Sequence, residues 1–293
     1  MNGISGVIFL GSKNVNLFED YVLIKELKNR GSFIEKYEDD NNISYSASHE
    51  SKNYIFSDDK FLINLSGRID NKEDIKNSLS LSGNVSDQEL ILLNFKKYGE
   101  ESFNKLVGAF SFLLFNKNTK EFYVVRDHLG IKPLYFFFKN DLFIYASEPK
   151  FIFLISNEKK ILNQSKLYDS ILRSDENFEN TFYEGIFRLE RGQFIKSNKG
   201  EINQFTYHRF KTPKYLEYDN EEECFEDFRK IFLKVIDQQT SDIKKIGSAL
   251  SGGLDSTSVT RVLADQNIKN GGKKEIFSYS FQFTDLDKYQ FKT

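Results

Sequence analysis

The residues most able to do chemistry lie near the carboxyl end, in the run Ser251-Gly252-Gly253-Leu254-Asp255-Ser256. A glycine pair between a strand and a helix lets backbone N–H groups approach phosphate oxygens, and the helix start adds partial positive charge. The Ser251 and Ser256 hydroxyls can donate hydrogen bonds, and the Asp255 carboxylate can hold Mg²⁺ against a pyrophosphate. No lysine follows the glycines, which excludes the loop of phosphoryl-transfer NTPases. The spacing therefore predicts a phosphate-binding loop that can also hold Mg²⁺.

The elements that must position this loop form a β-loop-α-β unit. Their expected bounds are Ile246–Leu250 for the first strand, Asp255–Gln266 for a helix packed through Val259, Val262 and Leu263, and Ile276–Phe283 for the second strand. A preceding helix opens at Asn220 and Glu223 and carries Phe225, Phe228, Phe232 and Val235 on one face. The alternative is a plain turn in which Ser and Asp only cap the helix. Agreement of all six loop residues with both flanking elements favours the nucleotide site.

The pattern of apolar runs and turn residues over 1–210 predicts mainly strands. The expected strands are Gly6–Leu10, Phe61–Leu65, Ala109–Phe115, Glu121–Arg126, Leu134–Phe138 and Leu142–Ala146. Turn residues at 116–119 and 139–141 join the last four strands into two hairpins. Ser86 and Glu89 form a capping box before a helix that Gly99 ends. Because several strands are apolar on both faces, we expect sheets covered on both sides, in a sandwich with helices.

The loop resembles the signature of the N-type ATP pyrophosphatases, which adenylate a carboxylate, release pyrophosphate and pass the acyl group to an amine. Asparagine synthetase, argininosuccinate synthetase, GMP synthetase and NAD synthetase share it. Four upstream segments, Ser66–Asn71, Gly108–Phe112, Arg126–Tyr135 and Ala146–Lys150, resemble the amidotransferase domain of asparagine synthetase. The order of the two domains favours this family among those that share the loop. Within it, Arg126 and Asp127 are expected to brace a turn, which is a structural role.

The resemblance implies a domain plan and a ligand set. Residues 1–210 would form an α+β sandwich of the N-terminal-nucleophile-hydrolase type, 211–220 a connector, and 221–293 the start of an α/β Rossmann-like ATP-pyrophosphatase domain. Its ATP-binding residues would be Ala249, Ser251, Gly252, Gly253, Asp255, Ser256 and Phe281, with Asp255 as the metal ligand. In the family, the residues that hold the acyl substrate, a second magnesium carboxylate and a catalytic lysine lie farther along the chain than the segment that matches here. We therefore expect residue 293 to be the truncation point of a longer protein.

The amino terminus departs from the family. There, Cys follows the initiator Met, and its α-amine and thiolate hydrolyse glutamine; here position 2 is Asn2, whose amide is no nucleophile. Ser66 replaces the oxyanion-hole Asn, and the Arg-Leu-Ser stretch that grips the substrate has no counterpart in Tyr45–Asn53. Of the glutamine-pocket positions, Gly67 and Asp87 remain. The sequence predicts an inactive glutaminase.

Three functions stay open at this point. The leading one is an asparagine-synthetase-like, AMP- and pyrophosphate-forming amide ligase that uses ammonia or a substrate amine, not glutamine. β-Lactam synthetases and lasso-peptide cyclases resemble this arrangement. The second is a plain asparagine synthetase, which would serve amino-acid biosynthesis. The third is a non-catalytic nucleotide-binding fragment or scaffold.

Composition sets limits on partners and location. The chain has 41 basic and 43 acidic residues, and this near-balance disfavours a nucleic-acid binder. A single cysteine, Cys224, excludes an intramolecular disulfide framework. No signal peptide and no apolar run of membrane-spanning length is visible, so we expect a cytoplasmic protein with no membrane partner. The expected partner is a small-molecule or peptide carboxylate, and a homodimer is left open.

Overall fold

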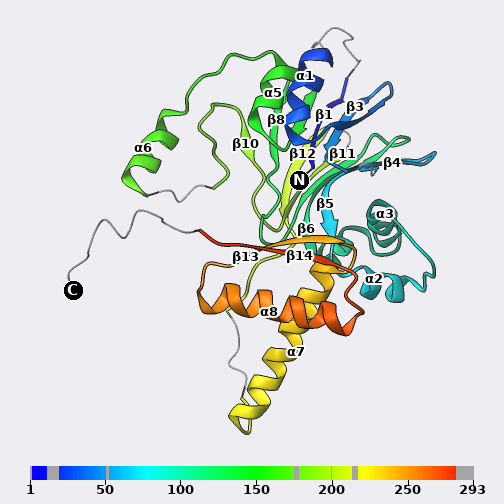
Figure 1. The fold of residues 1–293 in the computed structure, drawn as a ribbon. Coiled ribbons are helices and arrows are strands. Elements are labelled where there is room, and N and C mark those ends of the chain that lie inside the picture. Colours follow the sequence, from blue (N-terminus) through cyan, green and yellow to red (C-terminus); the bar gives the residue numbers. More distant parts are fainter. Residues whose placement is uncertain are drawn as a thin grey trace. The chain divides into compact units, whose positions relative to one another are not determined.

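The computed structural model describes residues 2–11, 20–50, 53–174, 178–198, 200–212 and 217–281. The chain divides into two compact units, Met1–Lys211 and Thr212–Thr293, and Figure 1 shows the elements of each. Among the described residues, none of the helices combines the length and the apolar character needed to cross a membrane.

The first unit contains two six-stranded antiparallel sheets. The first sheet has the order β10-β8-β9-β1-β3-β2, with the bounds β1 Gly3–Phe9, β2 Phe33–Glu38, β3 Asn42–Ser48, β8 Tyr135–Lys139, β9 Leu142–Ala146 and β10 Phe187–Arg188. The second has the order β12-β11-β7-β6-β5-β4, with the bounds β4 Ile55–Ser57, β5 Phe61–Ile69, β6 Gly108–Asn116, β7 Phe122–Arg126, β11 Gln193–Asn198 and β12 Glu201–Thr206. The predicted hairpins are confirmed as β6–β7 and β8–β9, one in each sheet.

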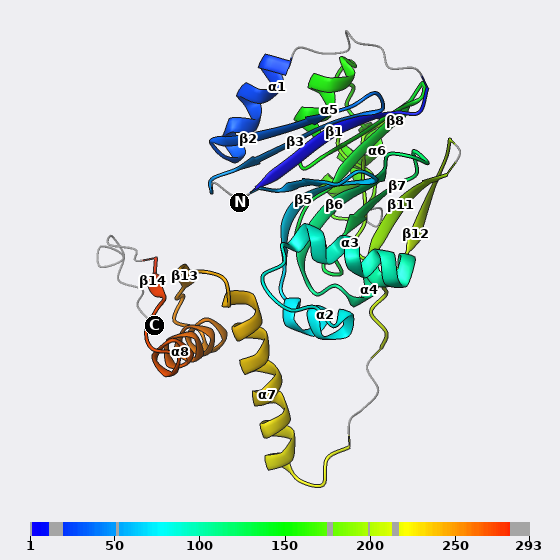
Figure 2. The ribbon, with the colours of Figure 1, turned by 90° about the vertical axis from the view of Figure 1, so that its right-hand side faces the viewer.

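Helices cover the outer face of each sheet (Figure 2). Their bounds are α1 Asp20–Leu27, η1 Lys28–Arg30, α2 Lys72–Leu79, α3 Asp87–Tyr98, η2 Gly99–Glu101, α4 Ser102–Lys105, α5 Pro149–Ser156 and α6 Gln164–Leu172. Helices α1 and α5 pack on the first sheet, and α2, α3 and α4 pack on the second. The capping box of Ser86 and Glu89 forms as predicted, and Gly99 ends α3. The arrangement is the α+β sandwich expected of the N-terminal-nucleophile-hydrolase type, so that prediction is confirmed.

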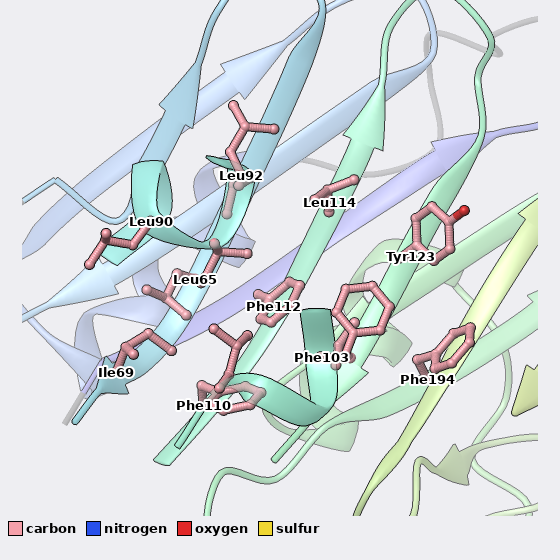
Figure 3. Close-up of a cluster of buried hydrophobic side chains, with 14 of the residues drawn as sticks. Leu65, Ile69, Leu90, Leu92, Phe103, Phe110, Phe112, Leu114, Tyr123 and Phe194 are labelled. Carbon is pink, nitrogen blue, oxygen red and sulfur yellow. The ribbon is translucent and has the colours of Figure 1, made fainter. Parts of the chain in front are cut away.

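The apolar residues of the first unit form three buried clusters. One lies between the sheets, where β1, β5, β6, β7 and β9 contribute alternate residues. The other two lie between each sheet and its helices. Phe103 of α4 stands at the centre of the cluster over the second sheet, against rings from β6, β7 and β11 (Figure 3). Burial on both faces explains why these strands read as continuous apolar runs.

The second unit consists of α7 Glu221–Thr240, β13 Lys245–Ala249, α8 Leu254–Lys269 and β14 Glu275–Tyr279. The Asn220 side chain caps α7 by accepting from the Glu223 N–H, as predicted. Strands β13 and β14 pair in parallel, which confirms the β-loop-α-β unit. Two details were wrong. Strand β14 ends at Tyr279, before the predicted Phe283, which lies outside the described residues. In α8, Leu263 is buried but Val259 is 38% exposed.

Candidate functional site

The amide side chain of Asn2 closes the exposed edge of β5. Its Nδ2 donates to the Leu65 carbonyl oxygen at 2.9 Å, and its Oδ1 accepts from the Gly67 N–H, also at 2.9 Å. A primary amide presents one donor and one acceptor in a plane, so Asn2 pairs with β5 as a backbone peptide group would. The Ser66 hydroxyl completes the contact by donating to the Asn2 carbonyl oxygen at 3.1 Å. These bonds join the start of β1 in the first sheet to β5 in the second.

Three successive edge donors of β5 are occupied by the chain itself. The N–H groups of Leu65, Gly67 and Ile69 are two residues apart and so face the same side of the strand. They donate to the Tyr54 carbonyl at 2.9 Å, to Asn2 Oδ1 and to Asp87 Oδ2 at 3.2 Å. Gly67 has φ +118°, and a Cβ there would lie 1.9 Å from the Ala109 carbonyl oxygen, so only glycine fits.

The predicted glutamine-pocket residue Asp87 already has an internal cation. Asp87 lies at the start of α3, is buried, and forms an ion pair with Lys72 at 2.7 Å. Beside it, Arg68 follows Gly67 on β5 and pairs with Asp70 at 2.7 Å. Burial raises the pKa of Asp70, an effect that the Arg68 charge opposes. Lys72 was not anticipated from the sequence, because an ion pair between residues 15 positions apart has no local signal.

These contacts define what the amino-terminal site can do. Asn2, Ser66, Gly67 and Asp87 are brought together, as the sequence analysis expected of residues from one pocket. The lone pair of the Asn2 amide nitrogen is delocalised into its carbonyl group, so this side chain is no nucleophile for a substrate carbonyl. The Gly67 N–H, an edge donor able to polarise a substrate oxygen, is bound to Asn2 instead. The arrangement is that of a structural joint between two sheets.

Arg126 and Asp127 brace the loop between β7 and β8, which confirms their structural role. The Arg126 guanidinium donates to the carbonyl oxygens of Lys132, Leu189 and Gly130 at 2.8, 2.6 and 2.6 Å. The buried Asp127 carboxylate accepts from the backbone N–H groups of Leu129, Ile131 and Lys132 at 2.9–3.0 Å. Both charged groups are hydrogen-bonded to backbone atoms, those of the loop itself and the carbonyl of Leu189.

The glycine loop in the second unit is open by comparison. Helix α8 begins at Leu254 with Gly253 as its N-cap residue, so no cap side chain accepts from the N–H groups of the first turn. The Ser256 and Thr257 hydroxyls instead donate to the Gly253 carbonyl oxygen at 3.2 and 2.8 Å. Gly252 has φ +86°, and a Cβ built on it would meet nothing within 4 Å. The Ser251 and Ser256 hydroxyls lie 3.0 Å apart, and the Ser251 N–H donates to Ser256 Oγ at 3.3 Å. The reading of Ser and Asp as caps of this helix therefore finds no support.

The remaining predicted nucleotide residues surround this loop and are exposed. Ala249 ends β13, and Asp255 lies in the first turn of α8. Among the described residues, the Asp255 carboxylate forms no ion pair or hydrogen bond. Phe281, two residues after β14, is 98% exposed. The Leu250 N–H donates to the Tyr279 carbonyl at 2.8 Å, and Ser280 Oγ donates to the Leu250 carbonyl at 2.7 Å, so the segment before Phe281 is held beside the loop.

The donor set fits a polyphosphate with a hard cation. An unpaired carboxylate, two hydroxyls and uncapped helix N–H groups are the groups that such a ligand uses. Within the ranges that the structure describes, no group of three or more His, Cys, Asp or Glu side chains could hold a metal by itself. Asp255 would therefore need oxygen ligands from the nucleotide. The sequence did not anticipate that the His128 and His208 rings lie 4.2 Å apart between centroids, tilted by 40°, since the two residues are 80 positions apart.

Comparisons with known proteins give matches over both units. The family model for the glutamine amidotransferase domain matches residues 1–208, and the model for asparagine synthase matches residues 227–291. Two relatives from Bacillus subtilis (strain 168) are the glutamine-hydrolysing asparagine synthetases 3 and 1. The first is 24% identical over 239 residues, 80% of this chain and 38% of its own length. The second is 30% identical over 216 residues, 71% of this chain and 33% of its own length.

A solved structure adds a further match. Glutamine phosphoribosylpyrophosphate amidotransferase from B. subtilis, complexed with ADP and GMP, aligns with 99% of this chain and 70% of its own, at 14% identity and a TM-score of 0.48. The chain spans only about a third of the length of the two asparagine synthetases that it resembles.

Proposed function

The chain belongs to the glutamine amidotransferase domain family and carries part of an asparagine synthase domain, and from this premise we propose that it serves an ATP-dependent amide ligase that does not draw its amine from glutamine. The predicted resemblance to asparagine synthetase is confirmed by these matches. The observation that carries the proposal is the Asn2 amide hydrogen-bonded to both Leu65 and Gly67 of β5. Residue 2 has become part of the sheet joint, so the amine must be free ammonia or an amino group of the substrate.

The glycine loop supports the ligase half of the proposal. Uncapped N–H groups at the start of α8, with the Ser251 and Ser256 hydroxyls, would hold the β- and γ-phosphates of ATP. The Asp255 carboxylate would hold Mg²⁺, which supplies positive charge against the departing pyrophosphate. The exposed Phe281 ring would lie against the adenine. No lysine is present in the loop, in keeping with attack at the α-phosphorus.

The proposed reaction has two steps. A carboxylate oxygen of a small-molecule or peptide substrate attacks the α-phosphorus of ATP, and the bond to the β-phosphate oxygen breaks to release pyrophosphate. The amine then attacks the acyl carbon, AMP leaves with the electron pair of the broken C–O bond, and the ammonium proton passes to solvent. Enzyme groups in this chain contribute by binding and orienting the triphosphate.

Asp255→Asn tests the loop assignment. Asn and Asp cap helices about equally well, so a structural role would tolerate the change. A magnesium ligand would not, and we expect magnesium-dependent pyrophosphate release to fall at least about 100-fold. Pyrophosphate is measured with ATP, ammonia and a panel of carboxylates on a protein extended through the rest of the asparagine synthase domain, and circular dichroism checks the fold of both variants. Phe281→Asp should weaken ATP binding instead. Equal release by wild type and Asp255→Asn would refute the assignment, and no release from either would favour a nucleotide-binding scaffold.

A further inference from the structure

A cavity of about 370 Å³ lies in the first unit, beside the loop that joins β7 to β8. Its walls include His128 of that loop, Arg191 just before β11, and His208, Arg209 and Phe210 after β12. Pockets that hold small ligands have volumes of roughly 300–1,000 Å³. The cavity is therefore large enough for a compact ligand, and it is separate from both the amino-terminal site and the glycine loop.

Backbone hydrogen bonds hold the walls of this cavity in place. The Gly192 N–H donates to the Asp127 carbonyl oxygen at 3.0 Å, and the His208 N–H donates to the Gly192 carbonyl oxygen at 3.1 Å. Gly192 has φ +64°, and a Cβ there would lie 2.5 Å from the His208 carbonyl oxygen, so glycine is needed for this close approach. The His208 ring is fixed in turn by a hydrogen bond between its Nδ1 and Asn104 Oδ1 at 2.9 Å.

Planar side chains follow one another along the wall. The His128 and His208 ring centroids are 4.2 Å apart, and the His208 and Phe210 centroids are 4.9 Å apart with the rings nearly perpendicular. The Arg191 guanidinium carbon lies 5.9 Å from the centroid of the Phe210 ring. These contacts place two imidazole rings and a guanidinium group around one cavity, although the residues come from separate segments of the chain.

The cavity wall carries an excess of positive charge. Over the ranges that the structure describes, neither Arg191 nor Arg209 forms an ion pair or a side-chain hydrogen bond. Among the described lining residues, Glu190 is the only acid, so two guanidinium groups stand against one carboxylate. His128 Nε2 is buried and has no hydrogen-bond partner in the described part of the chain. A polar atom left in this way costs free energy that a bound ligand would recover.

We propose that this cavity binds a phosphate group through the Arg191 and Arg209 guanidinium groups. A guanidinium donates two parallel hydrogen bonds to phosphate oxygens. Two such groups offer more N–H donors than the two oxygens of a carboxylate accept, whereas a phosphate has three or four oxygens. The Thr206 hydroxyl also lines the cavity; it accepts from Gln193 Nε2 at 3.3 Å, which leaves its proton free to donate.

The phosphate can be free or part of an ester, and the exposed Phe210 ring offers a surface for a planar group of an ester. The site does not depend on the proposed ligase function, because its lining residues all belong to the first unit and none to the glycine loop.

Nuclear magnetic resonance of the full chain with ¹⁵N-labelled histidine tests the site. The chain has three histidines, and His49, in an exposed position after β3, provides a control within each spectrum. Inorganic phosphate and phenyl phosphate are titrated at pH 7.0 and at a fixed ionic strength set with chloride. The His128 and His208 signals should shift saturably and the His49 signal should not. Tighter binding of phenyl phosphate would identify an aromatic ester as the ligand, and equal binding would identify the phosphate group alone.

Substitution of the arginines provides the second readout. Arg191→Met should weaken the binding about 10- to 100-fold, the value of a hydrogen bond to a charged group. Arg209→Met should act in the same direction, so that a folding defect of one variant, detected by circular dichroism, leaves the other. Arg229→Met removes the same charge from an exposed position on α7 and should bind as wild type does. Equal shifts of all three histidines, no saturable shift with either compound, or unchanged binding by both cavity variants would overturn the proposal.

Discussion

The amino-terminal site and the glycine loop treat their backbone donors in opposite ways. At the amino terminus, the edge N–H groups of β5 are occupied by Tyr54, Asn2 and Asp87, and the acid Asp87 is neutralised by Lys72. At the glycine loop, the first turn of α8 has no side-chain cap, and Gly252 faces open space. A buried polar group that is satisfied internally stabilises a fold, whereas exposed donors around an unpaired carboxylate leave room for a ligand.

We propose from this difference that one activity of a two-domain family can be lost while the fold that carried it persists. A single amide at position 2 supplies two hydrogen bonds between the sheets, so Asn2 reinforces the sandwich whether or not the activity is present. In the glycine loop of the second unit, by contrast, the described residues do not occupy the groups that could bind a ligand in this way. The loop keeps the groups that a nucleotide needs, and residues that would only cap a helix are not used for capping.

The largest expected effect compares the two units as folded bodies. Phe103 is fully buried and contacts rings from α3, β6, β7 and β11, and Phe103→Ala should destabilise the first unit by about 3–5 kcal/mol. Phe225 in α7 is 61% exposed, so Phe225→Ala should change stability by less than about 0.5 kcal/mol. Urea unfolding followed by circular dichroism measures both. Similar costs for the two substitutions would contradict the contrast in packing.

The next effect compares the two sites. Asn2→Ala leaves the Gly67 N–H and the Leu65 carbonyl without partners in a buried region, which should cost about 2–4 kcal/mol. Ser251→Ala removes an exposed hydroxyl contact and should cost less than about 0.5 kcal/mol. Hydrogen exchange at the Gly67 amide provides a local readout, since it should be slow in wild type and fast in Asn2→Ala. Slow exchange in both would show that Asn2 does not protect this edge.

The features of the fold that could be predicted from the sequence are those whose interacting residues lie close together along the chain. The hairpins β6–β7 and β8–β9 were predictable because apolar runs flank short polar turns, and the capping box of Ser86 and Glu89 is local. Strand β3, Asn42–Ser48, was missed because four of its seven residues are polar and it contains no apolar run. The alternation of these polar residues with Ile43, Tyr45 and Ala47 is a strand signal that could have found it. Helix α5 is almost wholly apolar, which hides its period.

The candidate sites divide in the same way. The glycine loop is contiguous, so its residues could be named together before the structure was known. Asn2 was recognised as a missing nucleophile, but its bonds to Leu65 and Gly67 span more than 60 positions and follow only from the packing of two sheets.

The smallest expected effect is a pH dependence confined to the first unit. Burial and the neighbouring His208 ring lower the pKa of His128 to about 4. The folded state thus favours the neutral ring. The neutral His128 ring contributes its full share to the free energy of unfolding above the ordinary histidine pKa of about 6.5, and this share is lost as the pH falls toward 4. Because the ring is partly exposed, we expect a loss of only about 1 kcal/mol.

His128→Gln removes this titration. The difference in unfolding free energy between wild type and His128→Gln, measured in urea at pH 7.0 and at pH 4.5, should shrink by that amount at the lower pH. Carboxylates that titrate in the same range, including the nearby Asp127, affect both proteins and cancel in the difference. Parallel pH profiles would contradict the assignment of the shift to His128.

The most direct test of the central claim is glutamate release from glutamine by the purified chain, with and without ATP. We expect release at buffer background in both conditions, because the Asn2 amide is hydrogen-bonded into β5 and provides no nucleophile. Asn2→Cys alone should stay at background too, because the resemblance places Ser66 where the family has its oxyanion Asn, and Asp87 is already paired with Lys72. Glutamate release by wild type clearly above background would contradict the account.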